Sequence, residues 1–446
     1  MKKLIAVEIC VVIALAVGFW LGRITSPYND YAHYYDNADK AWFNVQEMDT
    51  PPISFDEPDK NRLRKVRAAY RAVFDNYPDS RWADDAIYQL ASRLPRTDEE
   101  GFALFRRLIR DYPDSEYADD SMYAVAIATY RIAEEFKKTG TLESPTAYYD
   151  RALTLFNQII AIYPGSVLQE EAQYSAAMCY YGSGDVNTAL SELENLKIEF
   201  SNHPISYKIR YMLGLIYLEQ QDYEDAKKEF LNVIDSGDPK YGPLASFYIA
   251  NIYFNEGNKI EFEANFKEEQ GKLQEAEAEK DEAMKKYQES VDGYQRVIDL
   301  YSDTKVGQDA LFYIALPLEK LKTYDDAITR LEAAIEAYPD NENASNSKYY
   351  IGQLAYLNND TAKAIEVFQE FADDLSHTYD DRLQAQYQVG YIYEKDIEDL
   401  EQAIDAYEKL ISDYPEPHKN PSHPSRSITE NYVQQLKAEF LDEAIE

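Results

Sequence analysis

The chain has 446 residues, 45% of them apolar, with 81 acidic and 45 basic side chains and a formal net charge of −36. This much apolar material supports a folded core, which excludes the class of disordered acidic proteins. The charge excludes an ordinary nucleic-acid-binding protein, because such proteins present basic surfaces, and it fits either a well-solvated surface or a basic protein partner.

The first element in chain order is an apolar run over residues 4–22, which follows Lys2 and Lys3 and is interrupted only by Glu8. A helix of about 20 residues spans a bilayer, so we expect residues 1–24 to form a single-pass transmembrane signal anchor. Basic residues before the run and acidic residues after it place the remainder of the chain outside the cytoplasm, in the periplasm.

Two features of this run bear on how the chain meets the membrane. Ala14-Leu15-Ala16 has the small-x-small form of a signal-peptidase site, so a secreted periplasmic protein, released by cleavage, is the alternative to an anchor. Cys10 follows Val7-Glu8-Ile9, which is not the small-residue sequence that lipidation requires. We therefore expect no lipid anchor.

Residues 25–61 contain prolines at positions 27, 51, 52 and 58 and are expected to form a spacer, with a short helix over residues 31–45. Such a spacer would hold the following domain away from the membrane and let it pivot. The folded domain is expected to begin at residue 62.

A structural repeat follows. An aromatic residue stands three positions before a small residue eight times, and five of the seven steps between those small residues are 35 to 38 residues long. A fixed period of this size is typical of stacked helix pairs. The aromatic residues, called the aromatic ladder from here on, are Tyr88, Tyr123, Tyr174, Tyr211, Phe247, Phe312, Tyr349 and Tyr387.

The second helix of each repeat has its own pattern. A small residue is followed four positions later by a bulky one, as at Ala226 and Phe230, so the two side chains lie on one face of a helix. Because proline cannot continue a helix, Tyr-Pro pairs mark the ends of five second helices. These pairs stand at residues 77–78, 112–113, 163–164, 338–339 and 414–415.

The pattern resembles the tetratricopeptide repeat superfamily over residues 62–415. The resemblance is clearest at Leu213-Gly214, Tyr217, Ala226 and Phe230, and again at Ile351-Gly352, Ala364 and Phe368. It implies an all-α, right-handed α-solenoid of about eight helix pairs that binds other proteins. The Tyr-Pro repeat ends, with Ala-Asp-Asp-Ala or a relative after them, resemble bacterial envelope proteins of the BamD and CpoB type. The position of Cys10 departs from BamD, which is a lipoprotein.

One step of 65 residues contains an insertion over residues 257–289, rich in Glu, Lys, Gln and Ala, which predicts a projecting helix or helical hairpin. Phe266, Leu273, Tyr287 and Tyr294 are spaced by multiples of seven, with Lys280 breaking the series. A lengthened helix supported by the solenoid and a coiled-coil contact with another chain, including a second copy, both stay open.

After the last repeat, residues 416–446 are expected to form a loop and a C-terminal capping helix, because a solenoid needs an altered terminal unit. Within the loop, His418 and His423 are close, but they stand in a proline-rich run over residues 415–424. A loose turn is expected there rather than a metal site.

The aromatic ladder is the candidate functional surface. By the resemblance, its residues line or border the concave face of the solenoid, where half-exposed rings bind an extended or helical peptide segment. The alternative is that the rings only pack adjacent first helices together. The candidate partner-binding residues are Tyr123, Tyr174, Tyr211, Phe247, Phe312, Tyr349 and Tyr387, with Tyr181, Tyr356 and Tyr391 nearby.

Motifs of catalysis are missing from the sequence: it has no nucleophile elbow, phosphate loop, zinc-protease helix, CxxC pair or calcium loop. We therefore expect no enzyme activity, no cofactor and no metal, and we expect Cys10 and Cys179 to form no disulfide. The function that follows is a membrane-anchored scaffold that supports assembly of an envelope protein complex. A permanent structural subunit of a larger enzyme complex or polymer is the alternative, and a cell-wall enzyme is a third possibility.

Overall fold

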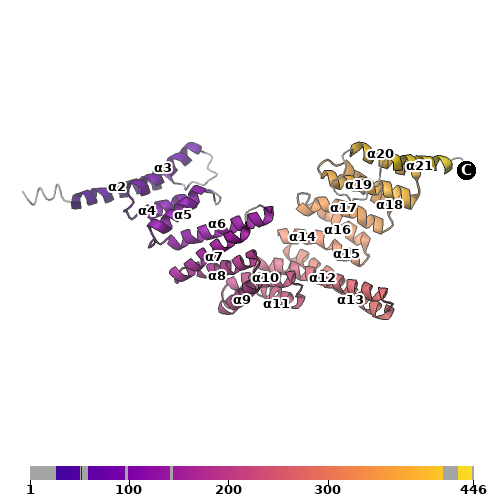
Figure 1. Cartoon of the computed structure of the whole chain (residues 1–446), viewed down its shortest axis with the longest axis horizontal. Coiled ribbons are helices and arrows are strands. Elements are labelled where there is room, and N and C mark those ends of the chain that lie inside the picture. Colours follow the sequence, from indigo (N-terminus) through magenta and orange to yellow (C-terminus); the bar gives the residue numbers. More distant parts are fainter. Residues whose placement is uncertain are drawn as a thin grey trace, which may run out of the picture. The chain divides into compact units, whose positions relative to one another are not determined.

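A computed structural model describes residues 27–50, 52, 59–95, 99–140, 144–414 and 430–443. Every regular element in these ranges is a helix, which confirms the all-α class (Figure 1). Among the described helices, no stretch combines the length and the apolarity needed to span a bilayer. The predicted transmembrane segment, residues 1–24, lies outside the described residues. The chain divides into two compact units, Met1–Ile209 and Arg210–Glu446.

The first unit is a stack in which each helix packs on the next one along the chain. Three ladder residues, Tyr88, Tyr123 and Tyr174, lie on α4, α6 and α8, the first helices of their pairs. The helices of this unit are α2 (Pro27–Met48), α3 (Lys60–Asn76), α4 (Ala83–Ser92), α5 (Glu99–Asp111), α6 (Ala118–Thr139), α7 (Pro145–Ile162), α8 (Gln169–Ser183) and α9 (Val186–Glu199), followed by the start of α10 (Ile205–Glu219).

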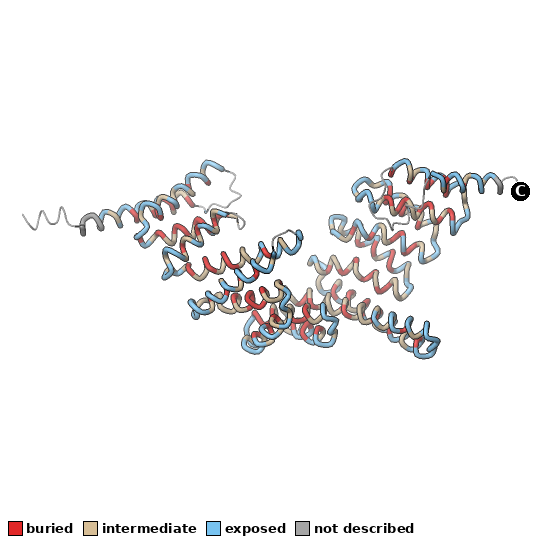
Figure 2. The backbone as a smooth tube through the Cα atoms, in the orientation of Figure 1, coloured by how far each residue is buried: buried red, intermediate tan, exposed pale blue. Residues whose placement is uncertain are grey.

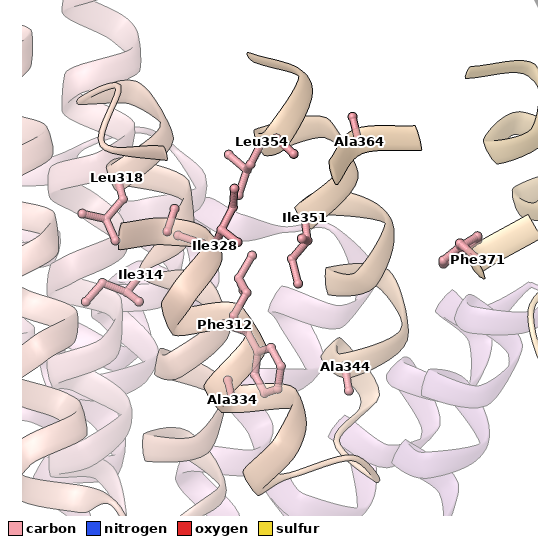
Figure 3. Close-up of a cluster of buried hydrophobic side chains, with 14 of the residues drawn as sticks. Phe312, Ile314, Leu318, Ile328, Ala334, Ala344, Ile351, Leu354, Ala364 and Phe371 are labelled. Atoms are coloured by element: carbon pink, nitrogen blue, oxygen red, sulfur yellow. The ribbon is translucent and has the colours of Figure 1, made fainter. Parts of the chain in front are cut away.

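The second unit continues from α10, whose Tyr211 meets the ring of Phe230 on the next helix, and its later helices pair in the same way. Buried residues lie along the paired helices (Figure 2), and Phe312, Ile328 and Ile351 meet in its core (Figure 3). Its helices are α11 (Tyr223–Asp235), α12 (Tyr241–Glu269), α13 (Leu273–Tyr301), α14 (Lys305–Tyr313), α15 (Ala315–Lys320), α16 (Tyr324–Ala337), α17 (Glu342–Leu357), α18 (Thr361–Asp373), α19 (Tyr379–Ile392), the π-helix η1 (Tyr393–Ile397), α20 (Leu400–Asp413) and α21 (Glu430–Glu443).

One first helix is interrupted. The helix that carries Phe312 is split at Ile314 into α14 and α15. Pro317 explains the break, because it has no N–H to donate to the carbonyl four residues earlier and its ring clashes with that carbonyl.

The two helices of a repeat touch through a small residue on the first helix and an aromatic ring on the second. A Cβ atom added at Gly214 would lie 2.6 Å from Cε1 of Phe230, and one added at Gly352 would lie 2.7 Å from Cε1 of Phe368. Any side chain would therefore push these helices apart. The sequence pattern singled out both kinds of residue, the small one in the first helix and the bulky one in the second, and the structure brings them together.

The Tyr-Pro ends connect neighbouring repeats. The hydroxyl of Tyr112, which follows α5, donates a hydrogen bond of 2.8 Å to the carbonyl oxygen of Pro78, one repeat earlier. Tyr163 follows α7 and donates in the same way to the carbonyl oxygen of Pro113, at 3.4 Å. Each of these tyrosines therefore stands at the end of its own helix and also bonds the turn of the preceding repeat.

Residues 27–48, which the sequence assigned to a spacer, instead form α2 and belong to the folded stack. Trp42 and Val45 of this helix are buried. Trp42 stacks on Trp82 with ring centroids 5.2 Å apart, and Nε1 of Trp82 donates to Asp39 at 2.6 Å. With α3, α2 forms a helix pair ahead of the eight predicted ones. The short helix predicted over residues 31–45 lies within α2, but a pivoting spacer does not fit this helix, because Trp42 and Val45 pack into the core.

The predicted insertion, residues 257–289, forms the outer part of a helical hairpin made by α12 and α13. Gly271 lies in the turn between them with a φ of 79°, a conformation that favours glycine. Tyr287 and Tyr294 are buried, whereas Phe266 and Leu273 are exposed. The residues spaced by sevens therefore do not form one continuous seam.

The last described helix, α21, covers the end of the second unit. Val433 is buried in the cluster that α21 shares with α20. Tyr432 donates to the buried carboxylate of Glu394 at 2.7 Å, and Tyr407 donates to it at 2.9 Å. Burial alone would raise the pKa of Glu394, but Lys395 and the two tyrosine hydroxyls outweigh burial and hold the pKa below its ordinary value. Glu394 is therefore ionised at neutral pH and holds α21 in place.

Replacing Gly214 with Leu is expected to destabilise the second unit, since the new side chain must displace the ring of Phe230. Overpacking of this kind costs about 1–3 kcal/mol, which urea unfolding measures as a lower midpoint. Gly165→Leu is the matched control, because a Cβ atom there has nothing within 4 Å. Equal stability of the two variants would contradict the repeat packing.

Replacing Tyr432 with Phe is expected to weaken the docking of α21 by roughly 1.5–3 kcal/mol, the usual contribution of a hydrogen bond to a charged group. Hydrogen exchange of the α21 amides at neutral pH measures the loss. Tyr35→Phe is the control, because the Tyr35 side chain is exposed and lies in the other unit.

The hydrogen bond between Tyr432 and Glu394 also makes the stability of the protein depend on pH. The folded-state pKa of Glu394 is depressed, so its contribution to stability is present above the ordinary pKa of a glutamate and is lost as the pH falls through the folded pKa. The difference in urea unfolding between the parent and Tyr432→Phe should therefore shrink in acid. A difference that is constant down to the acid limit would show that the hydroxyl acts through packing alone.

Candidate partner-binding site

The aromatic ladder packs within its own repeats. Tyr123 meets the ring of Phe156 on α7 with centroids 5.7 Å apart, and Tyr349 meets the ring of Phe368 on α18 with centroids 5.1 Å apart. Phe247 on α12 makes the same contact with Tyr294 on α13, at 5.3 Å. Each of these contacts joins a first helix to the second helix of the same pair, so the ladder contributes to the core.

The candidate residues differ in how much surface they offer. Phe312 is 5% exposed and Tyr174 is 7% exposed, so these two rings offer a partner the least surface. The others are half-buried: Tyr123, Tyr211, Phe247, Tyr349, Tyr387, Tyr181, Tyr356 and Tyr391. Tyr387 and Tyr391, one turn apart on α19, have ring centroids 6.1 Å apart. Partner binding by these residues remains a prediction.

A pocket opens beside the ladder in the first unit because the first helices differ in length. Leu94 and Pro95 follow α4, and a proline does not continue a helix, so α4 ends at Ser92 after 10 residues. The neighbouring α6 has 22 residues. Part of the α6 face that a longer α4 would cover is therefore open, and a cavity of about 300 Å³ lies there.

Three helices line this cavity, which is called the α4–α6 pocket from here on. The start of α5 contributes Phe102 and Phe105, and α4 contributes Tyr88. Tyr88 is fixed by stacking on Tyr117, with ring centroids 4.3 Å apart, and by an edge contact with Phe105 at 6.1 Å. The α6 wall is one helical stripe, Asp120, Tyr123, Ala124, Ile127, Ala128 and Arg131.

The electrostatics of the pocket favour a cation. Asp120 lies at one end of the α6 stripe, and burial together with the neighbouring Asp119 raises its pKa. The Tyr88 hydroxyl bonds this carboxylate and partly offsets the rise, and a positive charge nearby would stabilise the ionised form further. Arg131 lies at the other end of the stripe and is exposed. The pocket therefore suits an apolar side chain with a basic residue beside it.

Sequence reasoning found part of this pocket and missed the rest. Tyr88 and Tyr123 belong to the predicted ladder, whereas Phe102, Asp120 and Arg131 were not singled out. A signal was present in the sequence: the step of 51 residues after the small residue at 126 implies a long repeat next to one that stops at Leu94-Pro95. Helices of unequal length leave part of the longer one uncovered.

The described residues offer few groups for metal binding or for catalysis by a reactive thiol. No group of three His, Cys, Asp or Glu side chains there has the arrangement of a metal site. Cys179 is buried, and burial raises the pKa of its thiol to about 12, so it is protonated at neutral pH. His418 and His423 lie outside the described residues.

Comparison with known families gives matches over much of the chain. Residues 133–239 match the outer membrane lipoprotein family. Residues 211–292 and 318–377 match one tetratricopeptide repeat model, and residues 384–417 match another. No curated protein matches the chain.

Several solved structures are similar to this chain. The C-terminal part of a TPR repeat-containing protein from Cytophaga hutchinsonii is 15% identical, covering 65% of this chain and 97% of its own, with a TM-score of 0.44. A tetratricopeptide repeat protein from Parabacteroides merdae is 12% identical, covering 70% of this chain and 98% of its own, with a TM-score of 0.37. The apo form of RapI is 10% identical, covering 85% of this chain and 98% of its own, with a TM-score of 0.46.

The family matches agree with the repeat pattern and with the helix pairs of the fold. The chain therefore contains tetratricopeptide repeats and, over residues 133–239, resembles the BamD-like outer membrane lipoprotein family.

Proposed function

We propose that the protein is a non-catalytic, membrane-anchored scaffold that binds partner proteins through the α4–α6 pocket and the half-buried rings of the aromatic ladder. The observation that carries this proposal is the pocket itself, because it places Tyr88 and Tyr123 around an open apolar cavity. Tetratricopeptide repeat and BamD-like proteins generally act as scaffolds without catalytic activity, which supports the same function.

The pocket suggests how a partner binds. An apolar or aromatic side chain of an extended or helical segment enters between Phe105 and Ile127, and a basic residue next to it faces Asp120. About 300 Å³ is the lower limit of ordinary ligand pockets, so one large side chain fills it. Further contacts with half-buried ladder rings would add affinity by multivalency.

We place this scaffold in the bacterial envelope. Two observations support the location: the apolar run over residues 4–22 and the match of residues 133–239 to an outer membrane lipoprotein family. The work of such a scaffold is to hold envelope proteins together during assembly of a complex. A permanent structural subunit of a larger enzyme complex would use the same surfaces without exchange.

Filling the pocket tests the binding site. Ala128 lines the cavity, so Ala128→Phe places a ring in it, and recovery of the partner with tagged protein from gently solubilised membranes should fall at least about tenfold. Quantitative co-purification measures this ratio. Ala161→Phe on the exposed face of α7 is the matched control and should recover the partner at the parental ratio.

Two results would contradict the proposal. Equal recovery by Ala128→Phe and Ala161→Phe would move the binding surface away from the pocket, and no partner with the parent would remove the scaffold function itself. Exchange with added unlabelled parent protein separates the alternatives: a scaffold exchanges its partner, whereas a permanent subunit retains it.

The location is tested by protease added outside intact spheroplasts. We expect cleavage of the repeats, since the basic residues before the apolar run place the folded domain outside the cytoplasm. A cytoplasmic marker protein should be untouched in the same sample. Full protection of the repeats until the cells are lysed would reverse the topology.

A further inference from the structure

The hairpin of α12 and α13 is a rigid projection. Each of its helices has 29 residues, whereas α11 has 13. On its inner side Tyr287 fits against Gly257, where an added Cβ atom would lie 2.6 Å from the ring. The Tyr287 hydroxyl donates to Glu261 at 2.8 Å, and Lys320 of α15 donates to the same carboxylate at 2.7 Å. The outer half of the hairpin is thus held in a fixed orientation on the second unit.

The opposite side of α12 exposes two phenylalanine rings. Phe262 is 74% exposed and Phe266 is 57% exposed. They are four residues apart, so both rings lie on one face of the helix. Lys259 and Glu269 are exposed on the same face, one turn before and one turn after the pair. This set of four residues is called the α12 face.

We propose that the α12 face is a self-association surface, on which α12 of one copy packs antiparallel against α12 of a second copy. Centred on Ala264, this register sets Phe262 against Phe266 of the partner subunit, and the two-fold axis repeats the contact. The same register sets Lys259 against Glu269 of the partner subunit. The phenylalanine rings of the two copies thus form one apolar patch, with an ion pair between Lys259 and Glu269 at each of its two edges.

The charged residues of α12 disfavour a parallel pairing of the two helices and binding to a lipid surface. A parallel pairing would set Lys259 against a second lysine and Glu269 against a second glutamate, which is repulsive. A lipid surface is a poor occupant, because the exposed carboxylates of Glu263 and Glu269 lie beside the two rings and repel anionic headgroups. The antiparallel pair satisfies the rings and the flanking charges together.

The contact is small. Two phenylalanine rings from each copy, with one charged pair at each edge, bury less than about 1,200 Å², the lower limit of stable interfaces. We therefore expect a weak dimer whose population rises with protein concentration. An anchor in the membrane would raise the effective concentration of the two copies and favour the dimer there.

Charge reversal tests the register. Sedimentation of the full chain in detergent micelles should show a monomer–dimer equilibrium over a concentration series. Lys259→Glu or Glu269→Lys alone should weaken association at least about tenfold, because each creates two repulsive pairs. The double variant Lys259→Glu with Glu269→Lys should restore it. Lys285→Glu, an exposed reversal on α13, should leave association unchanged.

Cysteine cross-linking in native membranes gives a second readout, in a Cys10→Ser background. A copy with Lys259→Cys should cross-link to a co-expressed copy with Glu269→Cys. Neither should cross-link to itself, since ten residues of helix separate the like positions by about 15 Å. A chain that is monomeric in micelles and gives no cross-link would overturn the proposal. A double variant as weak as the single ones, with no mixed cross-link, would assign the α12 face to a different partner.

Discussion

The contact on which each unit depends is the close approach of a small residue on one helix to an aromatic ring on the helix that follows. Gly214 with Phe230, Gly352 with Phe368 and Gly390 with Tyr407 are examples in the second unit, where an added Cβ atom would lie 2.3 to 2.7 Å from the ring. Because the ring fills the space that a side chain would occupy, helix separation and ring placement are set together. At two of the Tyr-Pro ends, Tyr112 and Tyr163 then bond the turn of the preceding repeat.

The surfaces proposed for binding arise where this regular pattern is interrupted. At α4 the first helix is too short, so the stripe from Asp120 to Arg131 on α6 is open and forms a pocket. At α12 and α13 both helices are longer than those of the other repeats, and the outer part of α12 exposes Phe262 and Phe266. In both places helix length, rather than a special chemical motif, creates the surface.

The outermost helices of the chain's described part are held by buried carboxylates that accept from tyrosine. After α2, Asp49 is 4% exposed and accepts from the Tyr70 hydroxyl at 2.6 Å. At α21, Glu394 accepts from Tyr432 and Tyr407. A terminal helix has a neighbour on one side only, so it buries less apolar surface than an inner helix does. A hydrogen bond to a buried charge adds both stability and a defined position.

The sequence by itself determined the helical class, the repeat and the positions of its small and bulky residues, because each rests on local periodicity and side-chain size. The sequence did not determine that α2 joins the stack. Tyr35 stands three residues before Ala38, as in the aromatic ladder, but this pair was not recognised as a repeat because the next small residue, Ala91, is too far along the chain. Tertiary structure alone decided which aromatic residues are exposed. Phe266 and Tyr287 are separated by three heptads, yet only Tyr287 is buried against the other helix of the hairpin. Burial depends on how two helices pack and not on the spacing of residues along one helix.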